Sequence, residues 1–190
     1  MMFESYQYFQ MKNLEFYKKL FPAMEKYGVN VLIENSTAKN MGAQYYANTG
    51  EDMLAFLKFA NHPLLHACWD TGHGNCEGAQ YNNIVTLGEE LYAIHYNDNH
   101  GFSDEHLIPF FGTLNHDEVI NALIDVDFKG YFTLESSLSL VGKNDWPHMR
   151  RSFVSDTRLA EPQLFMQQKC ESLLYDVSKY ILTSYGLFEE

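Results

Sequence analysis

The sequence contains few cysteines and no long apolar run, and these absences exclude several classes of protein. Only three cysteines occur in 190 residues, Cys68, Cys76 and Cys170, and no two form a Cys-x-x-C pair. A disulfide framework and a thiolate zinc site of that spacing are therefore excluded. Reduced thiols, and the lack of a basic then apolar region near Met1, predict a cytoplasmic protein without a signal peptide. No run approaches the ~18 apolar residues that span a bilayer, so no membrane partner is expected.

Positive charge is also scarce, because 13 Lys and Arg stand against 25 Asp and Glu, for a formal net charge of −12. Most of such a surface repels a phosphate backbone, which argues against nucleic acid as a partner. The exception is a basic stretch that contains Lys143, Arg150, Arg151 and Arg158. Arg150 and Arg151 are candidates for holding a phosphate or carboxylate of a substrate. The alternative is that this stretch is a solvated loop.

Several nucleotide-binding and hydrolase motifs are missing as well. No Gly-x-Gly-x-x-Gly follows an apolar run, and there is no P-loop and no Gly-x-Ser-x-Gly. A dinucleotide-binding sheet is therefore disfavoured. What the sequence does contain is four short apolar runs that each end in a side chain able to bind a metal or transfer a proton. They are Gly28–Glu34, Leu64–Asp70, Leu91–His95 and Tyr131–Glu135.

Helical patterns lie between these apolar runs. We expect helices over residues 8–27, 50–61, 78–88, 116–126 and 162–185, with Pro22 kinking or splitting the first. Strands that are almost wholly apolar and that alternate with helices indicate a parallel sheet with right-handed crossovers. The sequence therefore predicts an α/β fold with four parallel strands, in one domain over residues 1–190.

The four run-ending side chains, Glu34, Asp70, His95 and Glu135, are predicted to meet at the carboxyl edge of the sheet. Three carboxylates and one imidazole favour a divalent ion such as Mn²⁺ or Mg²⁺, with Co²⁺ or Zn²⁺ as further options, over a structural zinc. Each residue also has an ordinary interpretation: the glutamates could cap loop amides, and His95 could be a hydrogen-bonded core histidine. His73 follows Asp70 into the next loop, and Trp69 precedes it. We expect His73 to face the ion or to bond within the loop, and Trp69 to wall the site.

Taken together, the motifs resemble the C-terminal half of the xylose isomerase-like TIM-barrel superfamily, which includes sugar phosphate isomerases/epimerases, ketose 3-epimerases, inositol-catabolism enzymes and endonuclease IV. The segments that carry the resemblance are Ile33–Asn35, Trp69–His73, His95–Asp98, Asp104–Pro109 with Gly112–Leu114, and Thr133–Glu135. The resemblance implies that the strands correspond to strands five to eight of a (β/α)₈ barrel. It also implies a small sugar or sugar phosphate as substrate.

By the same resemblance, Glu34 and Glu135 bind the metal and act as acid and base, while Asp70 and His95 complete the metal site. His73 would contact a substrate oxygen. Asp104 and His106 match a metal-binding pair of the endonuclease branch, but sugar isomerases often carry a similar pair without using it for metal. Whether these two residues bind a second ion is left open by the sequence.

The length departs from the pattern of the family, because a complete barrel needs ~250 residues and the first four strands are absent here. In a flat sheet the outer two of four strands would lie ~14 Å apart, so Glu34 and Glu135 can share an ion only if the sheet curls. A half-barrel also exposes two strand edges and an apolar concave face. We expect a homodimer or a complementary half-barrel subunit to cover them, unless the chain is a truncated product.

The sequence leaves several function classes open. The first is a metal-dependent sugar isomerase or epimerase that transfers a proton through an enediolate, with one glutamate removing the proton and the other returning it. The second is a non-catalytic half-barrel that works as a metal-binding or assembly module. A phosphodiesterase of the endonuclease type is weaker, because its further histidine ligands come from the missing half.

Overall fold

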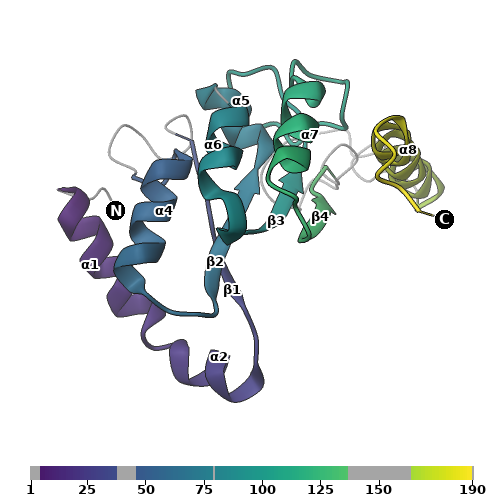
Figure 1. Ribbon diagram of the computed structural model, residues 1–190. Helices are drawn as coiled ribbons and strands as arrows, with labels where there is room; N and C mark the ends of the chain where they lie inside the picture. Colours follow the sequence, from purple (N-terminus) through teal and green to yellow (C-terminus); the bar gives the residue numbers. More distant parts are fainter. Residues whose placement is uncertain (1–4, 38–45, 79, 137–163, 190) are drawn as a thin grey trace, which may run out of the picture.

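The computed structural model describes residues 5–37, 46–78, 80–136 and 164–189 (Figure 1). Helices and strands alternate along most of these residues. In chain order the elements are α1 (Tyr6–Tyr17), α2 (Phe21–Tyr27), β1 (Val31–Glu34), α4 (Gly50–Ala60), β2 (Leu65–Asp70), α5 (Thr71–Glu77), α6 (Gln80–Leu87), the 3₁₀ turn η1 (Gly88–Glu90), β3 (Leu91–Tyr96), α7 (His116–Asp125), β4 (Tyr131–Leu134) and α8 (Leu164–Ser184). None of the helices described is both long and apolar enough to span a lipid bilayer.

The four strands form one parallel sheet in the order β1-β2-β3-β4. Asp70 pairs with His95, so these two residues are level, whereas Glu34 pairs with Cys68, two residues before Asp70. Helices α4, α6 and α7 lie side by side in front of the sheet in Figure 1. The predicted four-stranded α/β half-barrel is therefore confirmed.

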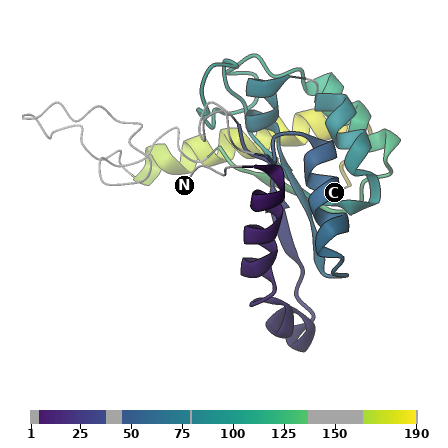
Figure 2. The same ribbon diagram turned by 90° about the vertical axis from the view of Figure 1, so that its left-hand side faces the viewer.

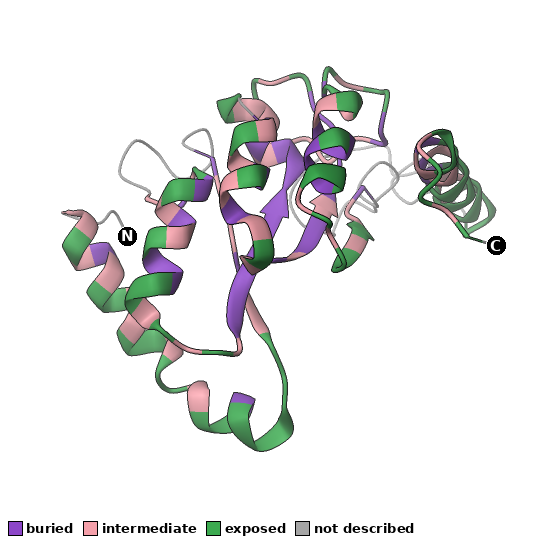
Figure 3. Ribbon diagram, viewed as in Figure 1, coloured by how far each residue is buried: buried purple, intermediate pink, exposed green. Residues whose placement is uncertain are grey.

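The core lies between this helical layer and one face of the sheet. Strand β2 is buried along its whole length (Figure 3). Apolar side chains of both layers make one cluster, to which the sheet contributes Ala67, Trp69, Ile94 and Tyr96 and the helices contribute Met53, Phe56, Ile84, Val119 and Ile120. Because successive strand residues point to opposite faces, the residues between these core positions, including Asp70 and His95, face the other way.

Local signals explain most of the helix boundaries. The long helix expected over 8–27 is split, as predicted at Pro22, which occupies the first turn of α2. Gly28 ends α2 in the left-handed conformation, with φ of 62°. The Thr49 hydroxyl caps α4 by accepting from the amide of Asp52. One helix was not predicted: α5 begins directly after Asp70, where we expected a loop.

The sheet is open at its outer strands. Within the described residues, β1 and β4 each pair with a single neighbour. Tyr131, on the face opposite the core helices, is 77% exposed, which is a large value for a tyrosine inside a strand. The beginning of α8 extends beyond the rest of the helices in Figure 2, and Leu164 and Phe165 are exposed there.

Candidate metal centre

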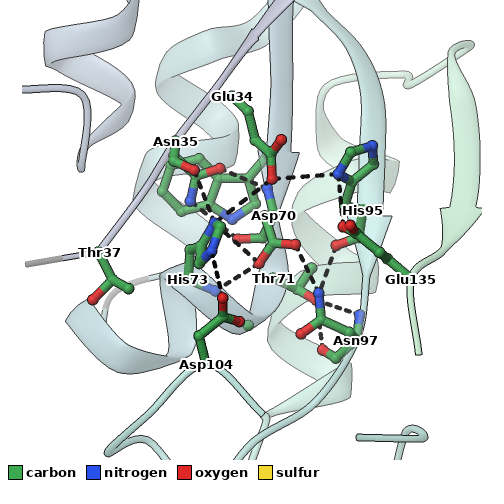
Figure 4. A network of polar contacts seen from close by, with 12 residues as sticks. Glu34, Asn35, Thr37, Asp70, Thr71, His73, His95, Asn97, Asp104 and Glu135 are labelled. Carbon is green, nitrogen blue, oxygen red and sulfur yellow. Dashed lines mark hydrogen bonds and ion pairs between the residues drawn. The ribbon is translucent and has the colours of Figure 1, made fainter. Parts of the chain in front are cut away.

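Four side chains converge at the carboxyl ends of the strands. Glu34 and Asp70 are the last residues of β1 and β2, and His95 is the last but one of β3. Glu135 directly follows β4, and its amide donates to the carbonyl of Tyr96, so the ladder continues to this residue. All four point to the side of the sheet away from the helices, and Figure 4 shows them facing a common centre.

The four groups are close enough to share one cation. One ligand atom from each of Glu34, Asp70, His95 and Glu135 lies within 4.8 Å of the others. His95 Nδ1 is 3.3 Å from Glu34 Oε1 and 2.8 Å from Glu135 Oε2. Metal–oxygen bonds of ~2.0–2.5 Å make such spacings compatible with ligands of a single ion. The sheet therefore curls strongly enough to bring its outer strand ends together.

Asp70 is the most enclosed of the four, with no exposed surface. One carboxylate oxygen, Oδ1, accepts from the amide of His73 at 2.6 Å, which also caps the N-terminus of α5. The other, Oδ2, accepts from the side-chain amide of Asn97 at 2.7 Å. Burial raises the pKa of Asp70 to about 6, although His73 opposes the shift. A cation beside the carboxylate would restore the charged form.

His95 lies between the two glutamates. The Cys68 thiol and then the carboxylates of Glu135 and Glu34 raise the pKa of its imidazole to about 12, while burial alone would lower it. His95 in turn lowers the pKa of Glu135. His95 Nδ1 and Glu135 Oε2 are both buried, yet neither makes a hydrogen bond of acceptable geometry. A buried imidazole–carboxylate ion pair beside two further carboxylates fits a divalent cation, which would replace the imidazole proton.

A second cluster adjoins the first and consists of His73, Asp104 and His106, whose ligand atoms also lie within 4.8 Å of one another. Asp104 bridges the two rings, at 3.0 Å from His73 Nε2 and 3.1 Å from His106 Nε2. The Nδ1 atoms lie 2.9 Å from the carbonyl of Asn35 and 2.8 Å from that of Glu135. In each ring, Nδ1 carries a proton and donates it to a carbonyl. The Nε2 atom of the same ring lies beside the Asp104 carboxylate, which only accepts, so Nε2 must also be protonated or bind a cation.

The charges of this cluster follow from that geometry. Burial would raise the pKa of Asp104, but hydrogen bonds from His106 and His73 lower it. Burial would lower the pKa of each histidine, but Asp104 raises both to about 9. Without a metal the two rings are therefore imidazolium ions at neutral pH. Both ring nitrogens of His73 already contact protein atoms. The predicted contact with a substrate oxygen therefore requires one of these two contacts to break.

Three other predicted site residues have different outcomes. The prediction that Trp69 walls the site is wrong, because the indole is fully buried on the helical face, where its N–H donates to Gln80 at 2.7 Å. Trp69 and Asp70 are consecutive in a strand and so point to opposite faces. Arg150 and Arg151 lie outside the described residues.

Sequence reasoning missed the asparagines that support the site. Asn35 is buried, and its side chain accepts from the amide of Asp70 at 2.6 Å and donates to the carbonyl of Asp70 at 3.0 Å. It thereby extends the pairing of β1 and β2 beyond their last ladder bonds. Asn97 supports the Asp70 carboxylate itself. Two signals were available: each asparagine closely follows a strand-end candidate, a position where loops use asparagine for many reasons, and both lie in segments that carry the family resemblance.

A curled parallel sheet with helices on one face, and three carboxylates and an imidazole at its carboxyl edge, defines half of a (β/α) barrel with a candidate metal centre. The sequence model of the xylose isomerase-like TIM barrel family matches residues 7–151, and the chain belongs to this family. The resemblance drawn from the motifs is thereby confirmed.

Relatives of known sequence include the uncharacterized protein MJ1311 of Methanocaldococcus jannaschii, which is 29% identical over 115 residues, or 59% of this chain and 38% of the relative. The protein y4fM of Sinorhizobium fredii is 27% identical over 95 residues, or 50% of this chain and 30% of the relative. The matched regions thus amount to well under two thirds of either relative.

Similar solved structures include the D-psicose 3-epimerase of Clostridium cellulolyticum H10 with D-tagatose, with a TM-score of 0.70 and 20% identity over 94% of this chain and 58% of that one. The IOLI protein with a bound zinc atom has a TM-score of 0.70 and 16% identity over 99% of this chain and 62% of that one. At these identities the likeness concerns the fold. The chain spans about three fifths of each of these structures.

Proposed function

We propose that this chain carries the metal centre and the proton-transfer groups of a divalent-metal-dependent sugar, or sugar phosphate, isomerase or epimerase. The observation that carries the proposal is the pair Glu34 and Glu135, whose carboxylates face each other across the ligand cluster. Binding of an ion alone does not require two acid/base groups on opposite sides of one centre. The solved structures of similar fold that act on D-psicose and L-ribulose support a ketose as substrate.

The residues of the chain have distinct tasks in such a reaction. Glu34, Asp70, His95 and Glu135 would hold the ion, whose charge makes a C–H bond beside a sugar carbonyl more acidic when it is bound. One glutamate removes that proton on one face of the substrate, and the other supplies a proton from the opposite face. Delivery to the same carbon gives an epimer, and delivery to the neighbouring carbon gives an isomer. His95 lowers the pKa of Glu135, so this carboxylate is ionised at neutral pH.

The donor set suits Mn²⁺ or Mg²⁺ best, because carboxylate oxygens predominate, and Co²⁺ or Zn²⁺ could occupy the same ligands. The zinc atom bound to the IOLI protein supports a divalent ion in this fold. A net charge of −12 favours a small substrate over nucleic acid, either a neutral sugar or one whose phosphate is bound by a local basic group. Arg150 and Arg151 are proposed to clamp a substrate phosphate. If alanine at both positions leaves the affinity for a sugar phosphate unchanged, that part is wrong.

The open sheet requires a partner for full activity. A second copy of the chain or a complementary half-barrel would cover Tyr131 and the edges of β1 and β4, which have no further strand beside them within the described residues. The same openness favours the second candidate function, a non-catalytic half-barrel that binds metal or serves in assembly. Proton exchange separates the two candidates, because only the catalytic one labels the substrate.

The experiment is incubation of the Mn²⁺-loaded protein with D-psicose, D-tagatose and D-fructose in D₂O, with deuterium incorporation followed by NMR. We expect exchange at one carbon that Glu135→Gln and Glu34→Gln slow by about 10²–10⁴-fold. Glu90→Gln is the matched control, since Glu90 also contacts a histidine, His66 at 2.9 Å, but at the opposite end of the strands. Metal binding without any exchange would favour the assembly module.

A further inference from the structure

A buried asparagine from a neighbouring segment holds the Asp70 carboxylate. Asn97 follows β3, has no exposed surface, and donates from Nδ2 to Asp70 Oδ2 at 2.7 Å (Figure 4). The direction of the amide is fixed by chemistry, because an ionised carboxylate only accepts and an amide oxygen there would be repelled. The NH₂ group therefore faces Asp70, and the amide oxygen faces away.

The surroundings of Asn97 keep it in this orientation. Its main chain is bonded twice to Thr71, whose hydroxyl donates to the Asn97 carbonyl at 2.7 Å and accepts from the Asn97 amide at 3.0 Å. Its side-chain oxygen is buried without a hydrogen-bond partner and lies against Gly72, where a Cβ would stand only 2.0 Å away. In this orientation the Asn97 side chain makes its hydrogen bond to Asp70, and its amide oxygen has no partner.

We propose that Asn97 is a positioning residue that fixes the Asp70 carboxylate for the cation, an inference that rests on the metal centre of the proposed function. With the amide of His73 on Oδ1 and Asn97 on Oδ2, rotation of the carboxylate breaks two hydrogen bonds at once. The remaining lone pairs are thereby directed at the ion before it arrives.

Asn99 provides a matched comparison within the same loop. It is also fully buried, and its Nδ2 also makes one short hydrogen bond across to the segment after β2, to the carbonyl of Gly72 at 2.7 Å. Among the described residues, none of its hydrogen bonds reaches one of the four candidate ligands. Loss of the Asn99 side chain removes three hydrogen bonds and loss of the Asn97 side chain removes one, so Asn99 is the more demanding structural control, but only Asn97 acts on a candidate ligand.

The test compares Asn97→Ala, Asn97→Asp and Asn99→Ala in the full chain. Mn²⁺ affinity is measured by electron paramagnetic resonance, the ligand field by the visible spectrum of bound Co²⁺, and folding by thermal unfolding without metal. We expect Asn97→Ala to bind Mn²⁺ about 10–100-fold more weakly, with an altered Co²⁺ spectrum. Asn97→Asp should bind more weakly still, although it keeps the volume, because a second carboxylate then faces Asp70. Asn99→Ala should lose stability while it keeps the affinity and the spectrum.

A purely structural role predicts the reverse order, with the isosteric Asn97→Asp closer to the unaltered chain than Asn97→Ala. That order, or equal effects of Asn97→Ala and Asn99→Ala on affinity and spectrum, would overturn the proposal. If Asn97→Asp does not fold, the two alanine variants decide alone. An unaltered chain that binds no Mn²⁺ refutes both this inference and the proposed function. Metal binding without proton exchange refutes only the sugar chemistry, and the asparagine comparison then still decides the role of Asn97.

Discussion

Glu34 ends β1 and Glu135 directly follows β4, the two outer strands of the sheet, yet one carboxylate oxygen of each lies within 4.8 Å of the other. In a flat sheet of four strands the same ends would be ~14 Å apart. The curvature of a barrel wall is therefore present in this half alone. It places two groups that can exchange protons on either side of the point where the ligand atoms converge.

Metal affinity should rise with pH. Coordination requires Asp70 without its proton, whose pKa burial raises to about 6, and His95 without its proton, whose pKa Cys68 and the two glutamates raise to about 12. The metal competes with the His95 proton at every pH from 5 to 8, and with an Asp70 proton as well below about 6. The Mn²⁺ dissociation constant should thus fall about tenfold per pH unit above pH 6, and more steeply below it. Calorimetry in buffers of different ionisation enthalpy measures the protons released, and a pH-independent affinity would contradict this.

Asp104→Asn should destabilise the metal-free chain by about 2 kcal/mol, the value of hydrogen bonds to charged groups. His73 and His106 have raised pKa values, so their contribution is complete below the unfolded value of ~6.5 and is lost as pH rises through about 9. Asp104 has a lowered pKa, so its contribution is lost only in acid. Urea unfolding with EDTA should show a larger loss at pH 6 than at pH 10. Equal losses at both would contradict the ion-pair account.

Gly72→Ala should weaken both stability and metal binding. The new Cβ would stand 2.0 Å from Asn97 Oδ1, so Asn97 must move and release Asp70. We expect a loss of about 1–3 kcal/mol in the free energy of unfolding. Gly130→Ala is the control, since its Cβ would meet the carbonyl of Tyr92 at 2.1 Å, at the other end of the sheet. Gly130→Ala should lower stability and leave the Mn²⁺ affinity of the folded chain unchanged. A similar loss of Mn²⁺ affinity in both variants would refute the link between Gly72, Asn97 and the metal centre.

Tyr131→Lys should reduce self-association, or association with a complementary half-barrel, because Tyr131 is exposed on the open face of β4. The mass of the metal-loaded protein, measured by light scattering during size exclusion, checks this. Lys129→Ala, an exposed change just before the strand, is the control. A monomeric and fully active unaltered chain would show that no cover is needed.

The strands and the four converging side chains were predictable because each apolar run ends in its own polar group, and parallel strands align such ends. Helix α5 was not predictable, because Thr71-Gly-His-Gly-Asn has poor helix propensity. It forms because Asp70 caps it and because Gly72 and Gly74 admit close contact with Asn97 and Gln80. The Asp70 cap and the Gly74–Gln80 contact are local, but the Gly72–Asn97 contact joins segments far apart in the chain. The same limit hid the supporting asparagines, whose partners no local pattern reveals.

The most direct test of the shared centre is the number of Mn²⁺ ions bound per chain in the unaltered protein and in the Glu34→Gln and Glu135→Gln variants. Two residues at opposite edges of the sheet should each be required for the same ion. We predict that the unaltered chain binds one Mn²⁺ ion tightly and that each single variant binds it more weakly. The affinity of the double variant should be only slightly lower than that of either single variant. Additive, independent losses, or one variant that binds like the unaltered chain, would contradict the shared centre.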